Sequence, residues 1–302
     1  AGVIWGTDLI IKNESVSETI NTTVSKTTDT AVVPDRQYNW STMNEGPYHD
    51  AISFATSPDL LSWIDTGRLL VNHASVPDAV IKDGEIFLYF VDVSTDGIPE
   101  QIGLLRSTDN GTIWSDKVDI TINGLANKVP VDPCPLLLAD GRIRLYYLDM
   151  STAAGPEGIG SGIANRIYSA ISSDGINFTQ EEGYRYAQEG IFDPSVIKYG
   201  DTYRMYVGDA NGQNVYLATS TDGLNFTKVG IAYSGGAIPE VIYAFETYFL
   251  FTGGINIASS NDGVIFTSLP DRFESTINPL TADPSVIVLD DGTYLMFYKT
   301  RE

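Results

Sequence analysis

One type of segment occurs five times along the 302-residue chain, and no other feature restricts the fold as strongly. Each copy has an acidic residue, often next to proline, then an apolar run, a turn and a second run rich in aromatic residues. The acidic residues are Asp78, Asp132, Asp193, Glu240 and Asp283, which follow one another at intervals of 43 to 61 residues. Such an interval suits one four-stranded blade of a β-propeller together with its loops.

A second repeat lies between these segments and reads Ser-x-Asp, then glycine, then an aromatic residue. It occupies residues 107–114, 172–178, 220–226 and 260–266. Ser and Asp side chains hydrogen-bond to the backbone of tight turns, and glycine adopts positive φ there. The pattern predicts a hairpin between the third and fourth strands of each blade, with the aromatic ring in the core between blades.

The fifth copy of the first repeat ends at the C-terminus and supplies only two strands. Residues 48–63 match the second repeat, so the rest of that blade is predicted at the other end of the chain. We therefore expect an all-β, five-bladed β-propeller, closed by pairing of N-terminal and C-terminal strands in the last blade, which removes an exposed sheet edge. Residues 48–302 then form a single propeller domain, and residues 1–47 an N-terminal arm rich in Ser and Thr.

The five acidic residues should lie near the central channel, because the innermost strands of a propeller converge on its axis. Carboxyl groups crowded there repel one another, so that some must be protonated, paired with a base or joined by a cation. Paired carboxyl groups also suit glycosidic bond cleavage, in which one protonates the leaving oxygen and another activates water or attacks directly. The alternative is that these residues only form repeated turns at the start of each blade.

With these motifs the chain resembles the five-bladed propeller enzymes of glycoside hydrolase family 43 and, more distantly, the fructan-cleaving furanosidases. The resemblance implies that Asp78 is the general base, that Asp193 tunes pKa values and orients substrate, and that Glu240 is the general acid. It implies an inverting hydrolase of furanoside- or xyloside-type poly- or oligosaccharides. Two places depart from the family: Ile238-Pro239-Glu240-Val241 replaces Glu-Gly-Pro around the acid, and Asp283 stands where the family often has histidine.

Other residues are candidates for substrate binding. Asp132 and Asp283 belong to the predicted group on the axis, and Asp283 would also suit a channel Ca²⁺, which prefers carboxylate oxygens. His73 would reach the pocket rim or be an ordinary loop residue. Arg166 would bind a sugar hydroxyl or carboxylate, or balance the acids. Trp40 would stack on a sugar ring or anchor the arm. Beyond that calcium ion, no cofactor is required.

The charge narrows the choice of partners. The chain has 39 acidic and 18 basic residues and a formal net charge of −21, which argues against nucleic acid or an anionic membrane as partner. No apolar run is long enough to span a membrane. Cys134 is the one cysteine, expected to be a buried, inert thiol, and the two histidines are too few for an ordinary zinc site. We expect a secreted or extracellular monomer that acts on carbohydrate; a non-catalytic propeller that binds sugar or protein is the alternative.

Overall fold

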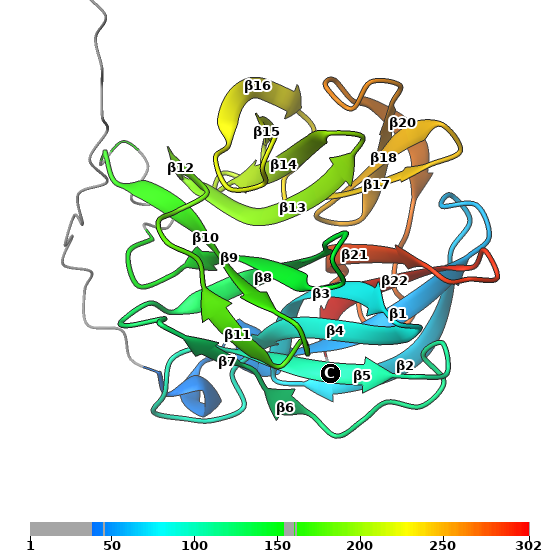
Figure 1. Ribbon diagram of the computed structural model, residues 1–302. Coiled ribbons are helices and arrows are strands. Elements are labelled where there is room, and N and C mark those ends of the chain that lie inside the picture. The colour runs from blue at the N-terminus through cyan, green and yellow to red at the C-terminus, as the bar shows by residue number, and fades with distance from the viewer. Residues whose placement is uncertain (1–37, 45, 154–159, 161, 302) are drawn as a thin grey trace, which may run out of the picture.

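The computed structural model describes residues 38–44, 46–153, 160 and 162–301. Five mainly antiparallel sheets surround a central channel, so that the prediction of an all-β, five-bladed propeller is confirmed (Figure 1). Most of the predicted arm, residues 1–47, lies outside the described residues. Two short 3₁₀ helices, η1 (Trp40–Thr42) and η2 (Pro47–His49), precede the first strand. Within the described ranges, no helix has the length and apolar character needed to cross a membrane.

Each blade is a sheet whose innermost strand lines the channel. Blade 1 contains β3 (Ala74–Lys82), β4 (Glu85–Asp92), β5 (Gln101–Ser107) and β6 (Val118–Asp119). Blade 2 contains β8 (Pro130–Leu137), β9 (Ile143–Asp149), β10 (Ala164–Ser172) and β11 (Asn177–Gln180), extended by β7 (Thr121–Asn123) and β12 (Tyr186–Glu189). Blade 3 contains β13 (Ile191–Tyr199), β14 (Thr202–Asp209), β15 (Val215–Ser220) and β16 (Thr227–Tyr233). Blade 4 contains β17 (Glu240–Ala244), β18 (Thr247–Thr252), β19 (Asn256–Ser260) and β20 (Thr267–Arg272).

Blade 5 combines strands that are far apart in the sequence. From the channel outward it contains β21 (Ala282–Val288), β22 (Tyr294–Arg301), β1 (Asp50–Ser57) and β2 (Ile64–Asn72). All eight residues of β1 pair with β22, from Asp50 opposite Arg301 to Ser57 opposite Tyr294. Because β1 lies between β2 and β22, neither β1 nor β22 has a free edge.

The Ser-x-Asp repeat forms the turn after the third strand of each blade. In blade 2 the Ser172 hydroxyl donates a hydrogen bond to Asp174 at 2.8 Å and accepts one from the Gly175 N–H at 2.9 Å. The same serine–aspartate bond occurs in the other four blades, at Ser57, Ser107, Ser220 and Ser260. These bonds are local, so the sequence pattern alone reveals the turn.

The aromatic residue after each turn packs against a ring on the second strand of the preceding blade. In three interfaces that second ring is a tyrosine, whose hydroxyl donates to a turn glycine carbonyl: Tyr89 to Gly175, Tyr146 to Gly223 and Tyr206 to Gly263. In the other two interfaces the pairs are Phe251–Trp63 and Phe297–Trp114. There the tryptophan indole N–H donates to the turn carbonyl, of Leu60 or Gly111. A hydrogen bond to the turn carbonyl therefore occurs at all five interfaces. Its donor is a tyrosine of the preceding blade in three of them and the tryptophan that follows the turn in the other two.

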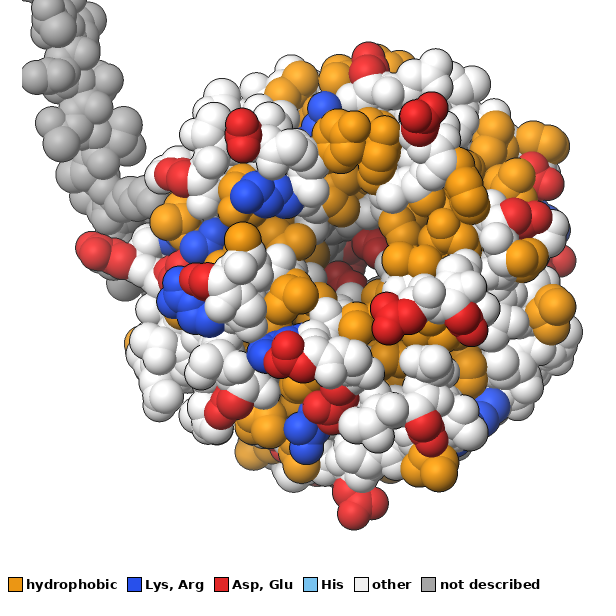
Figure 2. Space-filling view, turned by 45° about the vertical axis from the view of Figure 1, so that its right-hand side comes forward, with side chains coloured by type: hydrophobic (Ala, Val, Ile, Leu, Met, Phe, Trp, Pro, Cys, Tyr) orange, Lys and Arg blue, Asp and Glu red, His pale blue; other side chains and the backbone are white. Residues whose placement is uncertain are grey.

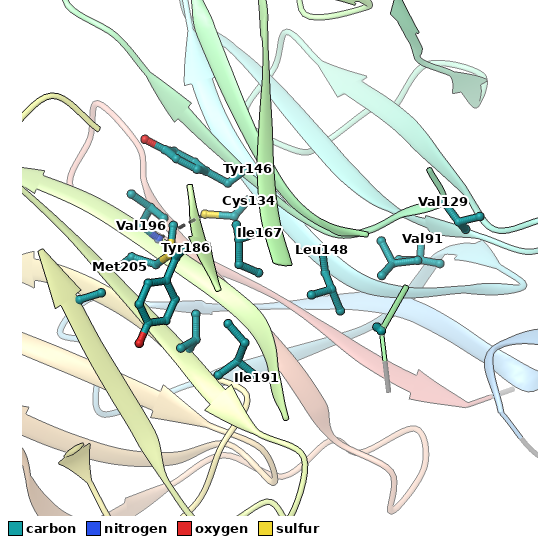
Figure 3. Close-up of a cluster of buried hydrophobic side chains, with 14 of the residues drawn as sticks. Val91, Val129, Cys134, Tyr146, Leu148, Ile167, Tyr186, Ile191, Val196 and Met205 are labelled. Atoms are coloured by element: carbon teal, nitrogen blue, oxygen red, sulfur yellow. Dashed lines mark hydrogen bonds between the residues drawn. The ribbon is translucent and has the colours of Figure 1, made fainter. Parts of the chain in front are cut away.

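An apolar cluster fills each interface between neighbouring blades. Figure 3 shows the cluster that lies mainly between blades 2 and 3, where Cys134 and Tyr146 face Val196 and Met205. Cys134 is a buried free thiol there, as expected. Burying one large apolar side chain contributes about 1.5–3 kcal/mol. This packing holds the five inner strands at a regular spacing around the channel and so positions the candidate site.

Candidate active site in the central channel

One X-Pro-Y tripeptide lies near the start of each inner strand, and this tripeptide places the acidic side chains. The five copies are Val76-Pro77-Asp78, Asp132-Pro133-Cys134, Asp193-Pro194-Ser195, Ile238-Pro239-Glu240 and Asp283-Pro284-Ser285. In every copy the residue before proline has a positive φ, between 47° and 59°. All five copies line the narrow part of the channel.

The five acids were expected at equivalent positions in the five copies. This expectation is wrong, because the acids occupy two different positions relative to the proline. Asp132, Asp193 and Asp283 precede the proline, whereas Asp78 and Glu240 follow it. We call the residues before proline the first ring (Val76, Asp132, Asp193, Ile238 and Asp283). The residues after proline form the second ring (Asp78, Cys134, Ser195, Glu240 and Ser285). The positive φ explains the choice of residue in part, because aspartate tolerates this conformation better than the β-branched Val76 and Ile238 do.

The first ring holds three aspartates and is linked by backbone and lysine contacts. The Asp193 N–H donates to Asp132 Oδ2 at 3.2 Å, and the Val76 N–H donates to Asp283 Oδ2 at 3.3 Å. Lys299 on β22 places Nζ 2.6 Å from Asp283 Oδ2. Asp132 and Asp283 are almost completely buried, with exposed fractions of 6% and 3%. The lysine thus supplies the positive charge that this group of carboxyls needs.

The second ring is joined by hydrogen bonds from blade to blade. In four interfaces, the second-ring side chain of one blade accepts a backbone N–H from the next blade. The donor is the residue that directly follows the second-ring residue of that next blade. The distances are 3.0 Å from Ala79 N to Ser285 Oγ, 3.2 Å from Val196 N to Cys134 Sγ, 3.0 Å from Val241 N to Ser195 Oγ and 3.0 Å from Val286 N to Glu240 Oε1. Two serine hydroxyls also donate to the acids, Ser285 to Asp78 Oδ1 at 2.8 Å and Ser195 to Glu240 Oε2 at 2.9 Å.

Asp78 is the exception in this series. The residue that would donate to it from blade 2 is Pro135, which has no N–H. Asp78 is instead bonded by the Ser285 hydroxyl and by the N–H of its own neighbour Ala79 at 2.7 Å. Asp78 therefore lacks the backbone donor from the next blade that the other four second-ring residues have.

Burial raises the pKa of most carboxyls in the two rings. The pKa of Asp78 is raised to about 7, against the lowering effect of the Ser285 and Ala79 hydrogen bonds. Burial, followed by the charge of Asp78, raises the pKa of Glu240 well above 4.5. In the first ring, burial raises the pKa of Asp132 to about 7, and burial with the charges of Asp132 and Asp283 raises that of Asp193 well above 3.8. Several of these groups are therefore protonated near neutral pH.

Two cavities meet at Asp78 and Glu240. The first lies among the X-Pro-Y tripeptides and has a volume of about 20 Å³, room for little more than one water molecule. The second has a volume of about 360 Å³ and extends along the inner strands past Cys134 and Ser195 to Tyr199 and Tyr243. The arrowheads of β8 and β13 point to the right in Figure 1, and Figure 2, which brings that side forward, shows acidic side chains deep in the central opening.

Three candidates for substrate binding lie outside the channel cavities, where their side chains contact other residues of the fold. Trp40 is only 5% exposed, and its Nε1 donates to the Ile98 carbonyl at 3.2 Å. His73 stacks on the Tyr48 ring at 4.2 Å and bonds the Tyr48 carbonyl through Nδ1 at 2.6 Å. Arg166 lies on β10 with its guanidinium 5.8 Å from the Tyr184 ring centre. None of the three lines either channel cavity.

Asp283 is the residue at which a channel Ca²⁺ was expected. The Lys299 ammonium lies against its carboxylate. Among the described residues, no group of three or more His, Cys, Asp and Glu side chains is arranged to hold a metal ion.

Lys299, Ser195 and Ser285 were not predicted from the sequence as site residues. Both serines follow Asp-Pro, so the repeated Asp-Pro-Ser at 193–195 and 283–285 was a signal that pointed to them. Lys299 follows an apolar strand segment and carries no such signal. Only its pairing with Ala282, next to Asp283, brings it to the first ring.

Comparisons with known proteins agree with the fold. No protein-family model matches the chain, and no curated protein matches it by sequence. The family 32 beta-fructofuranosidase of Bombyx mori has a similar structure, with 17% identity and a TM-score of 0.57 over 82% of this chain and 57% of that one. A GH43_1 enzyme of Xanthomonas citri, complexed with xylose, has 14% identity and a TM-score of 0.55 over 76% of this chain and 86% of that one. A thermostable family-43 glycoside hydrolase has 13% identity and a TM-score of 0.58.

These similarities define the class of fold. The chain has the five-bladed propeller architecture of glycoside hydrolases of families 43 and 32. It spans little more than half the length of the Bombyx mori enzyme, 57%.

Proposed function

We propose that this chain is a glycoside hydrolase that cleaves a poly- or oligosaccharide of furanoside or xyloside type, with Glu240 and Asp78 as the acid–base pair. The observation that carries the proposal is their placement. The Ser285 hydroxyl donates to Asp78, and the Val286 N–H donates to Glu240. Two successive residues of β21 therefore lie between the two carboxyl groups and contact one each. Both groups border a cavity of saccharide size.

The raised pKa values suit two different roles. Glu240, with its pKa well above 4.5, keeps a proton near neutral pH and donates it to the glycosidic oxygen as that bond breaks. Asp78, with a pKa of about 7, is ionised in part of the molecules and takes a proton from the attacking water. Water then adds to the anomeric carbon from the opposite side, and the configuration inverts.

Asp193 acts on this pair indirectly. It begins the tripeptide whose last residue, Ser195, donates to Glu240 Oε2. The strand that carries Asp193, β13, thus orients the acid through Ser195. The structural neighbours support the substrate class, since one is a beta-fructofuranosidase and another was crystallised with xylose. The net charge of −21 fits a secreted or extracellular monomer.

Hydrolysis of aryl furanosides, aryl xylosides and the matching oligosaccharides tests the proposal. Asp78→Asn and Glu240→Gln should each lower kcat/KM by about 10²–10⁴-fold, the usual contribution of a general acid or base. Asp140→Asn, in an exposed hairpin turn, is the matched control and should leave the rate unchanged. NMR of the first product shows whether the anomeric configuration inverts. Full activity in both site variants would exclude this acid–base pair.

A second candidate is a propeller that binds sugar without cleaving it. The observation in its favour is that both oxygens of Glu240 are already bonded to neighbouring blades, as in a purely structural ring. Calorimetry separates the two functions. A binder would keep its affinity in Glu240→Gln and release no product on long incubation.

A further inference from the structure

The larger channel cavity opens on what we call the hairpin face. This face carries the turns between the first and second strands of the blades, at residues 83–84, 140–141, 200–201, 245–246 and 291–292. The cavity lining runs from Asp78 and Glu240 in the second ring to Tyr199 and Tyr243 near two of these turns. Figure 2 looks onto this face and shows hydrophobic side chains around the opening.

We propose that a sugar unit binds in this cavity and reaches Asp78 and Glu240 from the hairpin face. The inference rests on the proposed function in naming the ligand as a saccharide. It adds the side of the propeller from which the ligand enters, and the residues that hold it.

Size separates the two sides of the acid pair. On the first-ring side, the cavity among the X-Pro-Y tripeptides has a volume of about 20 Å³, which accommodates a water molecule and no sugar ring. On the hairpin side it offers about 360 Å³, within the range of small-molecule sites. The carboxyl pair thus has room for one water molecule on one side and for a sugar unit on the other.

The cavity has a polar floor and apolar walls. Asp78, Ser195 and Glu240 form the floor, which combines a hydroxyl, a protonated carboxyl and a carboxyl that is partly ionised near neutral pH. Such groups both donate and accept hydrogen bonds, which suits sugar hydroxyls better than a fully charged ligand. Leu136 and Val196 contribute apolar wall surface, which suits the C–H faces of a sugar.

The rim of the cavity presents aromatic surface. The rings of Tyr199 and Tyr243 lie with centroids 4.3 Å apart, and their hydroxyls are 3.2 Å apart. Tyr199 is 46% exposed. Three more exposed apolar residues lie at or next to the ends of inner strands: Leu137, Phe245 and Val288. Single exposed apolar residues are ordinary, but these four lie at matching ends of the inner strands of blades 2 to 5, which suits a binding surface on the hairpin face.

The direct test uses xylotriose and arabinotriose with the full chain. Crystals soaked with either sugar should show a sugar unit in the cavity, within hydrogen-bonding distance of Asp78 or Glu240. Calorimetry should give a measurable affinity. If neither sugar binds at millimolar concentration, or if the sugar lies only on the first-ring side, the inference is wrong.

Two variants test the route. Leu136→Trp fills the cavity, and Tyr243→Ala removes one rim ring; each should weaken binding about tenfold or more, which corresponds to the loss of about 1.4 kcal/mol. Ile265→Trp adds the same ring on an exposed turn outside the cavity and is the matched control. Circular dichroism and melting temperature show that the variants fold. If Leu136→Trp does not fold, Tyr243→Ala alone decides.

The two proposals fail in different ways. An active enzyme whose rate and affinity are unchanged in Leu136→Trp and Tyr243→Ala keeps the proposed function and loses the hairpin-face site. A chain that binds sugar in the cavity, weakly in the two variants, without hydrolysing it keeps the site and loses the proposed function.

Discussion

Lys299 Nζ lies 2.6 Å from Asp283 Oδ2 in the central channel, in a chain that carries 39 acidic and 18 basic residues. The lysine side chain is 20% exposed and the aspartate side chain 3%. Burial lowers the pKa of Lys299, but the charges of Asp283, Asp50 and Asp193 outweigh this and raise it. The lysine is therefore charged at every pH at which the protein is expected to work, and it neutralises part of the first ring.

Replacing Lys299 with methionine should destabilise the protein by about 3–5 kcal/mol at pH 8, because Asp283 is left as a buried, uncompensated charge. Urea unfolding at pH 8 measures the loss. Arg142→Met, which breaks an exposed ion pair with Asp140, is the control and should cost at most about 1 kcal/mol. An equal, small effect of both substitutions would contradict the role of Lys299.

The ring carboxyls should make the protein less stable as pH rises from 4 to 8. Asp78 and Asp132 have pKa values of about 7 in the fold, against an ordinary value of 3.8. Between these values the folded state binds protons that the unfolded state has released, so the free energy of unfolding falls with rising pH. Asp78→Asn should remove part of this decrease, on the order of a few kcal/mol. Denaturant unfolding at pH 5 and pH 8 measures it, and identical slopes for wild type and variant would show that Asp78 is not protonated in the fold.

Pro135→Ala should lower the pKa of Asp78 below about 7. At the matching place in the other interfaces, Ala79, Val196, Val241 and Val286 donate an N–H to the second ring. Alanine at position 135 supplies the missing donor, which favours the ionised carboxylate. The rise of activity with pH, attributed to the base, should then move to lower pH. A ¹³C NMR titration of the Asp78 carboxyl measures the same shift without depending on activity, and an unchanged midpoint would refute the explanation.

Cys134→Ser should be tolerated, and Cys134→Ala should not. Serine occupies this second-ring position in blades 3 and 5, and its oxygen would accept the Val196 N–H that now lies 3.2 Å from Sγ. Alanine leaves that buried N–H without a partner, which costs about 1–3 kcal/mol. Thermal unfolding compares the two variants. Equal melting temperatures would mean that the N–H finds another acceptor.

Tyr146→Phe should destabilise the interface between blades 2 and 3 by about 1–3 kcal/mol, since the Gly223 carbonyl loses the hydroxyl 2.9 Å away. Adding Phe226→Trp should recover part of the loss, because the Phe251–Trp63 and Phe297–Trp114 pairs use the indole N–H for this carbonyl. The side chain of Phe226 is partly exposed, as those of Trp63 and Trp114 are, so the larger ring has room. A double-mutant cycle measures the coupling, and strictly additive effects would count against the exchange.

The blades, their hairpins and the Ser-x-Asp turns were predictable because each depends on short, local patterns. The arrangement of the acids was predicted only in outline. Aligning the repeats by acidic residue placed Asp78 with Asp132, although the shared proline aligns Asp78 with Cys134. The residue before each proline has a positive φ, which distinguishes the first-ring position from the second-ring position after the proline. Residue type alone does not reveal that backbone conformation.

The amino-acid sequence by itself determined the number of blades and the presence of carboxyl groups on the axis, since the repeat recurs five times and propeller strands converge. Tertiary structure decided which side chains meet there. Lys299 reaches the first ring through strand pairing. The side chains of Trp40 and His73 instead form hydrogen bonds with the carbonyls of Ile98 and Tyr48. These contacts join residues distant in the chain, and packing between elements selects them.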